Sequence, residues 1–69
     1  MNRKNETLIA ARKKLGKTKV QLATESKISI RGYQKYELEG SLPNAQIAIR
    51  IAKALGTTVE ELWGGNLTA

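Results

Sequence analysis

The sequence contains no cysteine, no histidine and no aspartate among its 69 residues. Without cysteine no disulfide can stabilise the fold, so the chain must fold by core packing alone, as suits a reducing compartment. Most of the usual general acids, nucleophiles and metal ligands are missing as well, because only six glutamates and some hydroxyls and amines remain. The composition argues against an enzyme and predicts no catalytic residue, no metal site and no cofactor.

Long apolar segments are also missing, since the longest uninterrupted apolar run extends only from Leu8 to Ala11. A membrane-spanning helix needs about 20 apolar residues, and the core of a signal peptide about 7 to 15. We therefore expect a soluble, cytoplasmic protein without a membrane partner. A chain of 69 residues makes one small domain, so we expect a single domain over residues 1–69 with marginal stability.

Positive charge is concentrated in the first half of the chain. Residues 1–36 contain ten basic and two acidic residues, a net charge of +8, whereas residues 37–69 contain two basic and four acidic residues, a net charge of −2. Such asymmetry indicates a polyanionic partner. A solvated lysine surface that serves solubility explains the charge equally well.

Capping residues divide the chain into five short segments with apolar residues at helical spacing. Thr18 and Thr58 are followed three residues later by Gln21 and Glu61, which is the pattern of a capping box. No alternating pattern indicates a strand. The sequence predicts an all-α fold of five helices over about residues 6–15, 19–26, 30–38, 45–55 and 59–63, with a frayed tail at 66–69.

Helices this short are unstable alone, so their apolar stripes must share one core. Trp63 fits two alternatives, because it either closes this core or joins Leu67 in a dimer contact. The predicted core consists of Leu8, Leu15, Leu22, Ile28, Tyr33, Ile47, Ile51, Leu55, Val59 and Leu62.

The segment from Lys19 to Leu38 predicts a helix-turn-helix, with Ser26, Lys27 and Ile28 as the turn. Ala23 offers a small side chain where the two helices cross. In such a motif the second helix enters the major groove of DNA while the first crosses the backbone.

With this motif in place, the chain resembles the Cro/C1-type (XRE-like) helix-turn-helix family of phage and bacterial repressors over about residues 6–65. The resemblance implies a compact lambda-repressor-like domain of five helices that binds double-stranded DNA. The matching features are Arg12 ahead of Gly16, Thr18 followed by Leu22 and Ala23, the segment Ser29–Glu37 with a bulky residue at Tyr33, and Ala52–Gly56 leading into Val59–Leu62.

Three lysines depart from the pattern of this family. Lys27 stands where the family most often has glycine, so the turn must hold a non-glycine residue in the left-handed region at a cost of about 1 kcal/mol. Lys17 stands where an apolar residue is common, and Lys19 where a glutamine is common. Both of the latter changes add positive charge.

The outward side of the third predicted helix supplies the expected base contacts, which are Ser29, Ile30, Arg31 and Gln34. Arg31 either forks onto guanine, grips a phosphate or points into solvent. Ile30 packs against a thymine methyl or is incidental surface, and Gln34 pairs with adenine or is solvated. Gly32 in this helix allows close approach of the backbone either to DNA or to the second helix.

Phosphate contacts are expected near the starts of helices, where free N–H groups and the helix dipole favour anions. For Thr18 and Asn44, simple capping is the alternative and is compatible with such a contact. The expected phosphate-binding residues are Thr18, Lys19, Gln21, Lys35, Ser41 and Asn44.

The resemblance also implies a structural ion pair between Arg12 and Glu37, because the family commonly joins an arginine of the first helix to a glutamate at the end of the recognition helix. The alternative is two separately solvated charges.

These observations predict a sequence-specific DNA-binding regulator of transcription, a repressor that occupies a palindromic operator as a weak homodimer. The alternatives are an antitoxin-like or regulatory subunit of a larger assembly, and a basic protein-interaction module. No small-molecule ligand is evident from the sequence.

Overall fold

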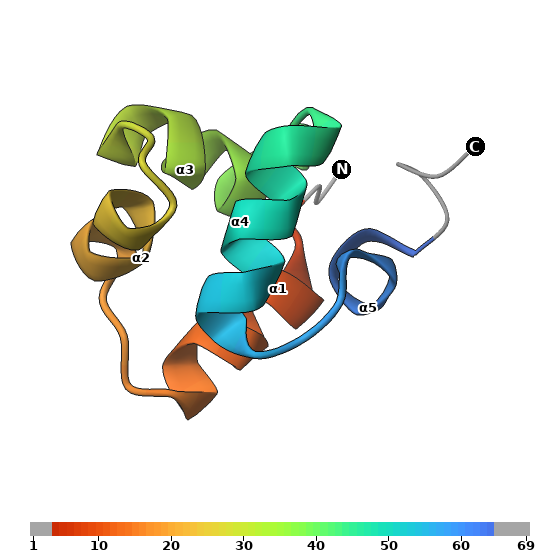
Figure 1. The fold of residues 1–69 in the computed structure, drawn as a ribbon, viewed down its shortest axis with the longest axis horizontal. Helices are drawn as coiled ribbons and strands as arrows, with labels where there is room; N and C mark the ends of the chain where they lie inside the picture. Colours follow the sequence, from red (N-terminus) through yellow and green to blue (C-terminus); the bar gives the residue numbers. More distant parts are fainter. Residues whose placement is uncertain (1–3, 65–69) are drawn as a thin grey trace.

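The computed structural model describes residues 4–64, which form five helices and, within that range, no strand (Figure 1). The all-α prediction is confirmed, and the first two helices each end one residue earlier than the sequence suggested. The helices are α1 (Glu6–Lys14), α2 (Lys19–Glu25), α3 (Ile30–Leu38), α4 (Ala45–Leu55) and α5 (Val59–Trp63). The tail that was expected to fray, residues 66–69, lies outside the described residues.

Each helix begins at a side-chain cap, which explains why such short segments start where they do. The side-chain oxygens of Asn5, Thr18, Ser29, Asn44 and Thr58 each accept a hydrogen bond from the backbone N–H three residues further on. In α2 the bond is reciprocal, since the Gln21 side chain also accepts from the Thr18 N–H, at 2.8 Å. Local sequence alone therefore sets all five starts.

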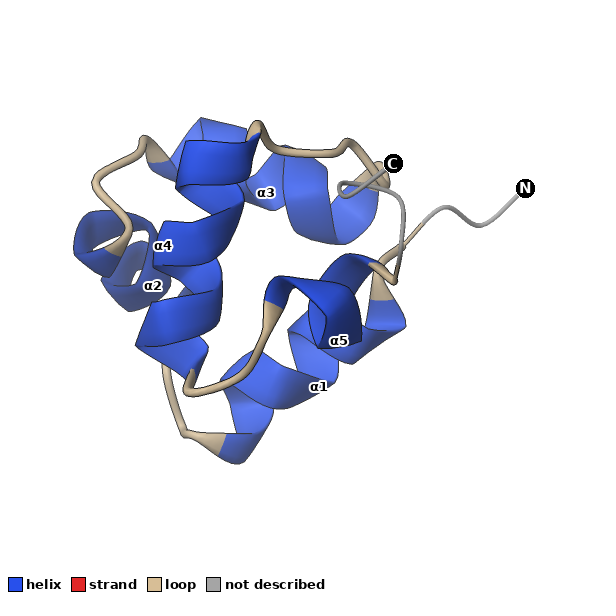
Figure 2. Cartoon of the chain, turned by 45° about the vertical axis from the view of Figure 1, so that its right-hand side comes forward, coloured by secondary structure: helices blue, strands red, loops and turns tan. Residues whose placement is uncertain are grey.

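The helices pack in a closed circuit around one core (Figure 2). Helix α2 packs against α3 and α4, α4 continues to α5, and α1 closes the circuit by packing against α5 and α3. The fully buried members of the core include Leu8, Leu22, Tyr33, Ala48 and Ile51. Because α3 is one member of this circuit, its position is fixed by α1 behind it and α2 beside it.

One predicted core residue was placed wrongly. Leu15 is 50% exposed, because α1 ends at Lys14 and the chain turns through Leu15 and Gly16, so the helical stripe does not continue to this position. Ile28, Ile47 and Val59 are only partly buried, at the edge of the core. Trp63, in contrast, is 5% exposed and belongs to the core.

No helix within residues 4–64 is long and apolar enough to cross a bilayer.

Candidate nucleic-acid interface

The turn between α2 and α3 is closed by consecutive backbone hydrogen bonds. The N–H groups of Ser26, Lys27 and Ile28 donate to the carbonyls of Leu22, Thr24 and Ala23, at 3.0, 3.1 and 3.0 Å. Lys27 has φ of 60°, so the expectation of a non-glycine residue in the left-handed region is confirmed. Ala23 is buried beneath the turn, which lets the two helices cross closely.

Four side chains on the outer side of α3 form one continuous surface. Gln34 follows Ile30 by four residues and Arg31 by three, and Lys35 follows Arg31 by four, so these side chains are neighbours along one side of the helix. Arg31 and Lys35 are exposed, Ile30 is 40% exposed, and Gln34 is half-buried. The predicted base-contacting residues are thus brought together, with the exposed Ser29 at the start of the face.

Ser29 keeps hydrogen-bonding capacity despite its role as a cap. Its Oγ accepts from the Gly32 N–H at 3.1 Å, which occupies one of its two acceptor positions and leaves its proton to donate. A Cβ added at Gly32 would lie 3.3 Å from this Oγ, and no atom of α2 lies within 4 Å of it. Close packing of Gly32 against α2 is therefore wrong, and the glycine makes room for the cap.

The predicted phosphate contacts lie at the starts of α2 and α4 and on the loop before α4. Thr18, Gln21 and Asn44 are exposed, whereas Lys19 and Ser41 are half-buried. In the caps of both helices an oxygen accepts from the backbone, and the NH₂ groups of Gln21 and Asn44 remain as donors. The backbone N–H of Ser41 donates to the Lys35 carbonyl at 3.3 Å, which connects this loop to the end of α3.

Behind α3, Arg12 and Glu37 form a buried ion pair. Arg12 Nε and Nη2 donate to the two carboxylate oxygens of Glu37 at 2.6 and 3.3 Å, and the two residues are 8% and 1% exposed. The remaining guanidinium nitrogen, Nη1, donates to the Lys17 carbonyl at 2.9 Å. This pair joins α1 to the last turn of the helix that carries Arg31.

Tyr33 completes this cluster, because its hydroxyl donates to Glu37 Oε2. Burial raises the pKa of the Tyr33 hydroxyl well above its ordinary value of 10, and the hydrogen bond to Glu37 raises it further. The hydrogen bonds with Glu37 also raise the pKa of Arg12. The raised pKa values keep the phenol of Tyr33 neutral and the guanidinium of Arg12 charged.

The role of the Tyr33 hydroxyl was missed in the sequence, which indicated only a core residue. Its four-residue spacing from Glu37 on one helix was the available signal. Trp63 lies in the core, as one of its two alternatives required, while Leu67 lies outside the described residues.

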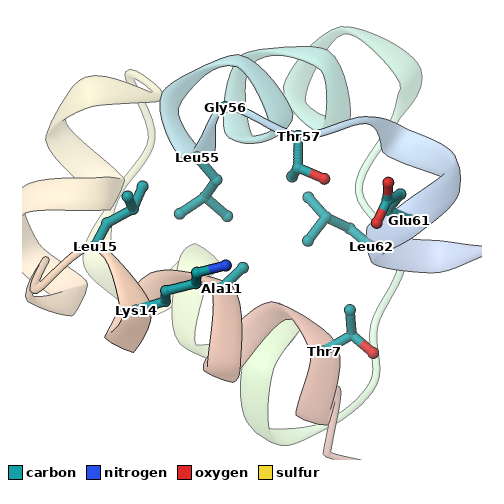
Figure 3. A pocket seen from close by; sticks show the side chains of 9 residues that line it. All are labelled: Thr7, Ala11, Lys14, Leu15, Leu55, Gly56, Thr57, Glu61 and Leu62. Atoms are coloured by element: carbon teal, nitrogen blue, oxygen red, sulfur yellow. The ribbon is translucent and has the colours of Figure 1, made fainter.

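An open groove of about 390 Å³ lies between α1, the end of α4 and α5 (Figure 3). Leu15, Leu55 and Leu62 line its apolar part, and Lys14 and Glu61 lie at its sides. None of its lining residues belongs to α2 or α3, so it is separate from the surface described above. Within residues 4–64, no group of three or more acidic, histidine or cysteine residues is placed to hold a metal ion.

Comparison with known proteins agrees with this geometry. A helix-turn-helix family model matches residues 8–62. The cryptic phage CTXphi transcriptional repressor RstR of Vibrio cholerae serotype O1 (strain ATCC 39315 / El Tor Inaba N16961) is 41% identical over 59 residues, which are 86% of this chain and 53% of the relative. The chain thus spans about half the length of this curated relative. No solved structure matches. The chain belongs to the Cro/C1-type helix-turn-helix family, whose members are DNA-binding regulators of transcription.

Proposed function

We propose that this protein binds a palindromic operator as a weak homodimer and represses transcription by occupying a promoter. The observation that carries the proposal is the outer face of α3, where Ile30, Arg31, Gln34 and Lys35 follow the cap Ser29 without an acidic residue between them. In a helix-turn-helix, the N-terminal part of the second helix reads base edges in the major groove.

The side chains on this face suit different parts of a base pair. The Arg31 guanidinium matches O6 and N7 of guanine, and the Gln34 amide matches N6 and N7 of adenine. Ile30 supplies an apolar surface for a thymine methyl. The hydroxyl proton of Ser29 can donate to an acceptor atom on the edge of a base. Together these contacts would determine which sequence the protein prefers in each half-site.

Phosphate contacts would fix the orientation of the domain on the duplex. Thr18, Lys19 and Gln21 would make these contacts from the start of α2, and Lys35, Ser41 and Asn44 from α3 and the loop before α4. The helix starts favour an anion, and the lysines and the amide NH₂ groups of Gln21 and Asn44 provide donors.

Repression is supported by the relative, which is a transcriptional repressor by name. A dimer with two-fold symmetry reads half-sites about one helical turn, roughly 34 Å, apart, which makes its operator palindromic. We expect the protein to act in the cytoplasm, on DNA that it meets there.

Selection of bound duplexes from a random pool tests this proposal, because it yields the site, its symmetry and its spacing together. We expect a palindrome with half-sites about 10 base pairs apart. A pool that yields no preferred sequence would contradict sequence-specific binding, and a single unrepeated half-site would contradict the dimer.

Arg31→Ala then tests the assignment of the reading face. Loss of a forked guanine contact should cost about 1 to 3 kcal/mol on the selected operator and relax discrimination at one base pair per half-site. Competition binding against operators substituted at each position measures both effects. Lys35→Ala is the matched control, since loss of a phosphate contact weakens all duplexes alike. If Arg31→Ala behaves like this control, Arg31 is a phosphate contact and Gln34 and Ile30 carry the specificity.

A further inference from the structure

Lys17, between α1 and α2, is bonded through all of its polar groups. Its backbone N–H donates to the Arg12 carbonyl at 3.2 Å, and its carbonyl accepts from Arg12 Nη1 at 2.9 Å. Its ammonium Nζ donates to Glu25 Oε1 at 2.5 Å and to the Ala54 carbonyl at 3.0 Å. One residue therefore connects α1, the last residue of α2 and the last turn of α4.

The bond to α4 satisfies a carbonyl in the last turn of this helix. The last carbonyls of a helix lack partners within the helix, and the helix dipole favours a cation there. The carbonyls of Ala52 and Lys53 are satisfied by the N–H groups of Thr57 and Gly56, at 2.9 and 3.1 Å. The Lys17 ammonium satisfies the carbonyl of Ala54, which lies between Lys53 and the end of the helix.

The same ammonium holds α2 at both of its ends. Lys17 directly precedes the cap Thr18, so fixing its side chain fixes the start of α2, and its bond to Glu25 fixes the end. The Lys17 ammonium is thus bonded to other groups of the protein. The ammonium groups of Lys19 and Lys35 have no such bonds among the described residues.

We propose that Lys17 is a positioning residue that sets the orientation of α2, so that Thr18, Lys19 and Gln21 meet phosphate while α3 enters the groove. The inference rests on the proposed function. It assigns Lys17 no contact with DNA, although Lys17 is a lysine in the most basic part of the chain.

Lys17→Met tests this inference, because methionine keeps the length of the apolar stem and removes only the ammonium. Binding to the selected operator is measured across a range of salt concentrations, at a temperature where circular dichroism shows the variant to be folded. We expect affinity to fall about three- to tenfold, and in a Lys19→Met background we expect Lys17→Met to leave the salt slope unchanged, because Lys17 has no phosphate contact of its own to lose. Lys19→Met is the matched control, and should lower the slope by about 1.

Glu25→Gln is a second variant, at an exposed position, that removes the carboxylate charge and so weakens one of the two ammonium bonds. Loss of a carboxylate near DNA would by itself strengthen binding, so weaker binding by Glu25→Gln supports positioning. In the Lys17→Met background the same substitution should no longer weaken binding.

Three results would overturn the inference. A salt slope that Lys17→Met lowers by about 1 even in the Lys19→Met background would make Lys17 a phosphate contact. Unchanged affinity in both variants, with only the unfolding midpoint lowered, would make the bonds purely structural. If the wild-type protein itself selects no operator, the proposed function fails, and this outcome is recognised without either variant.

Discussion

At the scale of single residues, the Arg12–Glu37 pair is the interaction whose loss should matter most for stability. Arg12→Ala leaves the buried Glu37 carboxylate with Tyr33 as its remaining side-chain partner. We expect the free energy of unfolding to fall by about 3 kcal/mol, as for other buried pairs that lose one member. Denaturant unfolding followed by circular dichroism measures this change.

Lys13→Ala, at an exposed position beside Arg12 on α1, is the matched control and should change stability by less than about 0.5 kcal/mol. A comparably small loss in Arg12→Ala would contradict a stabilising role for the pair.

Tyr33 gives the protein a pH dependence at high pH. Its raised pKa means that the folded state keeps the phenol proton, while the unfolded state releases it above about pH 10. The stabilisation is fully present below pH 10 and is lost as pH rises further, by up to about 1.4 kcal/mol per pH unit. In Tyr33→Phe this loss is absent, so the wild type should lose its advantage over the variant between pH 10 and 12.

Denaturant unfolding of both proteins between pH 8 and 12 checks this expectation, with Tyr36→Phe on the same helix as the control. Parallel stability curves for the wild type and Tyr33→Phe would show that Tyr33 titrates alike in the folded and unfolded states.

At the scale of structural elements, the turn between α2 and α3 contains a strained backbone at Lys27, which a substitution by glycine should relieve. Lys27 has φ of 60°, a region that costs a residue with a Cβ about 1 kcal/mol. Lys27→Gly should therefore raise the free energy of unfolding by roughly 0.5 to 1 kcal/mol. Lys35→Gly, within α3, should lower it by about 1 kcal/mol. If both glycines destabilise the protein, the turn is not strained.

The helix starts could be predicted from the sequence because each depends on neighbours in the chain. Thr18 and Gln21, for example, satisfy one another's backbone within a single turn. Leu15 was misassigned because periodicity does not show where a helix stops. The last residue of α1 is Lys14, directly before Leu15.

The bonds of Lys17 could not be predicted for a different reason. Its acceptors lie 8 and 37 residues away, and only the packed circuit of helices brings them to one ammonium. The Arg12–Glu37 pair, at a separation of 25 residues, was accessible only through the family resemblance.

At the scale of the whole molecule, the basic half of the chain contains α2 and almost all of α3, the helices that would make most of the contacts with DNA. Within residues 4–64, Arg12 pairs with Glu37 and Lys17 with Glu25, so these two cations are bonded inside the protein. If Lys19, Lys35 and the helix starts meet phosphates, log affinity should fall linearly with log salt, by about 0.9 per phosphate neutralised. Lys35→Ala should flatten this slope by about 1.

Titrations of operator binding at several salt concentrations measure the slope. Lys53→Ala, an exposed lysine of α4 with no proposed DNA contact, is the control and should leave the slope unchanged. Affinity that does not depend on salt would contradict the electrostatic basis of binding.

The Arg12–Glu37 pair also connects thermal stability to occupancy of the operator. A loss of about 3 kcal/mol lowers the melting temperature of a domain of this size by roughly 12 to 24 °C. Arg12 is buried behind α3, so its substitution removes no side chain of the reading face from a molecule that remains folded. Such a variant would be a temperature-sensitive regulator, which holds its operator in the cold and releases it on warming.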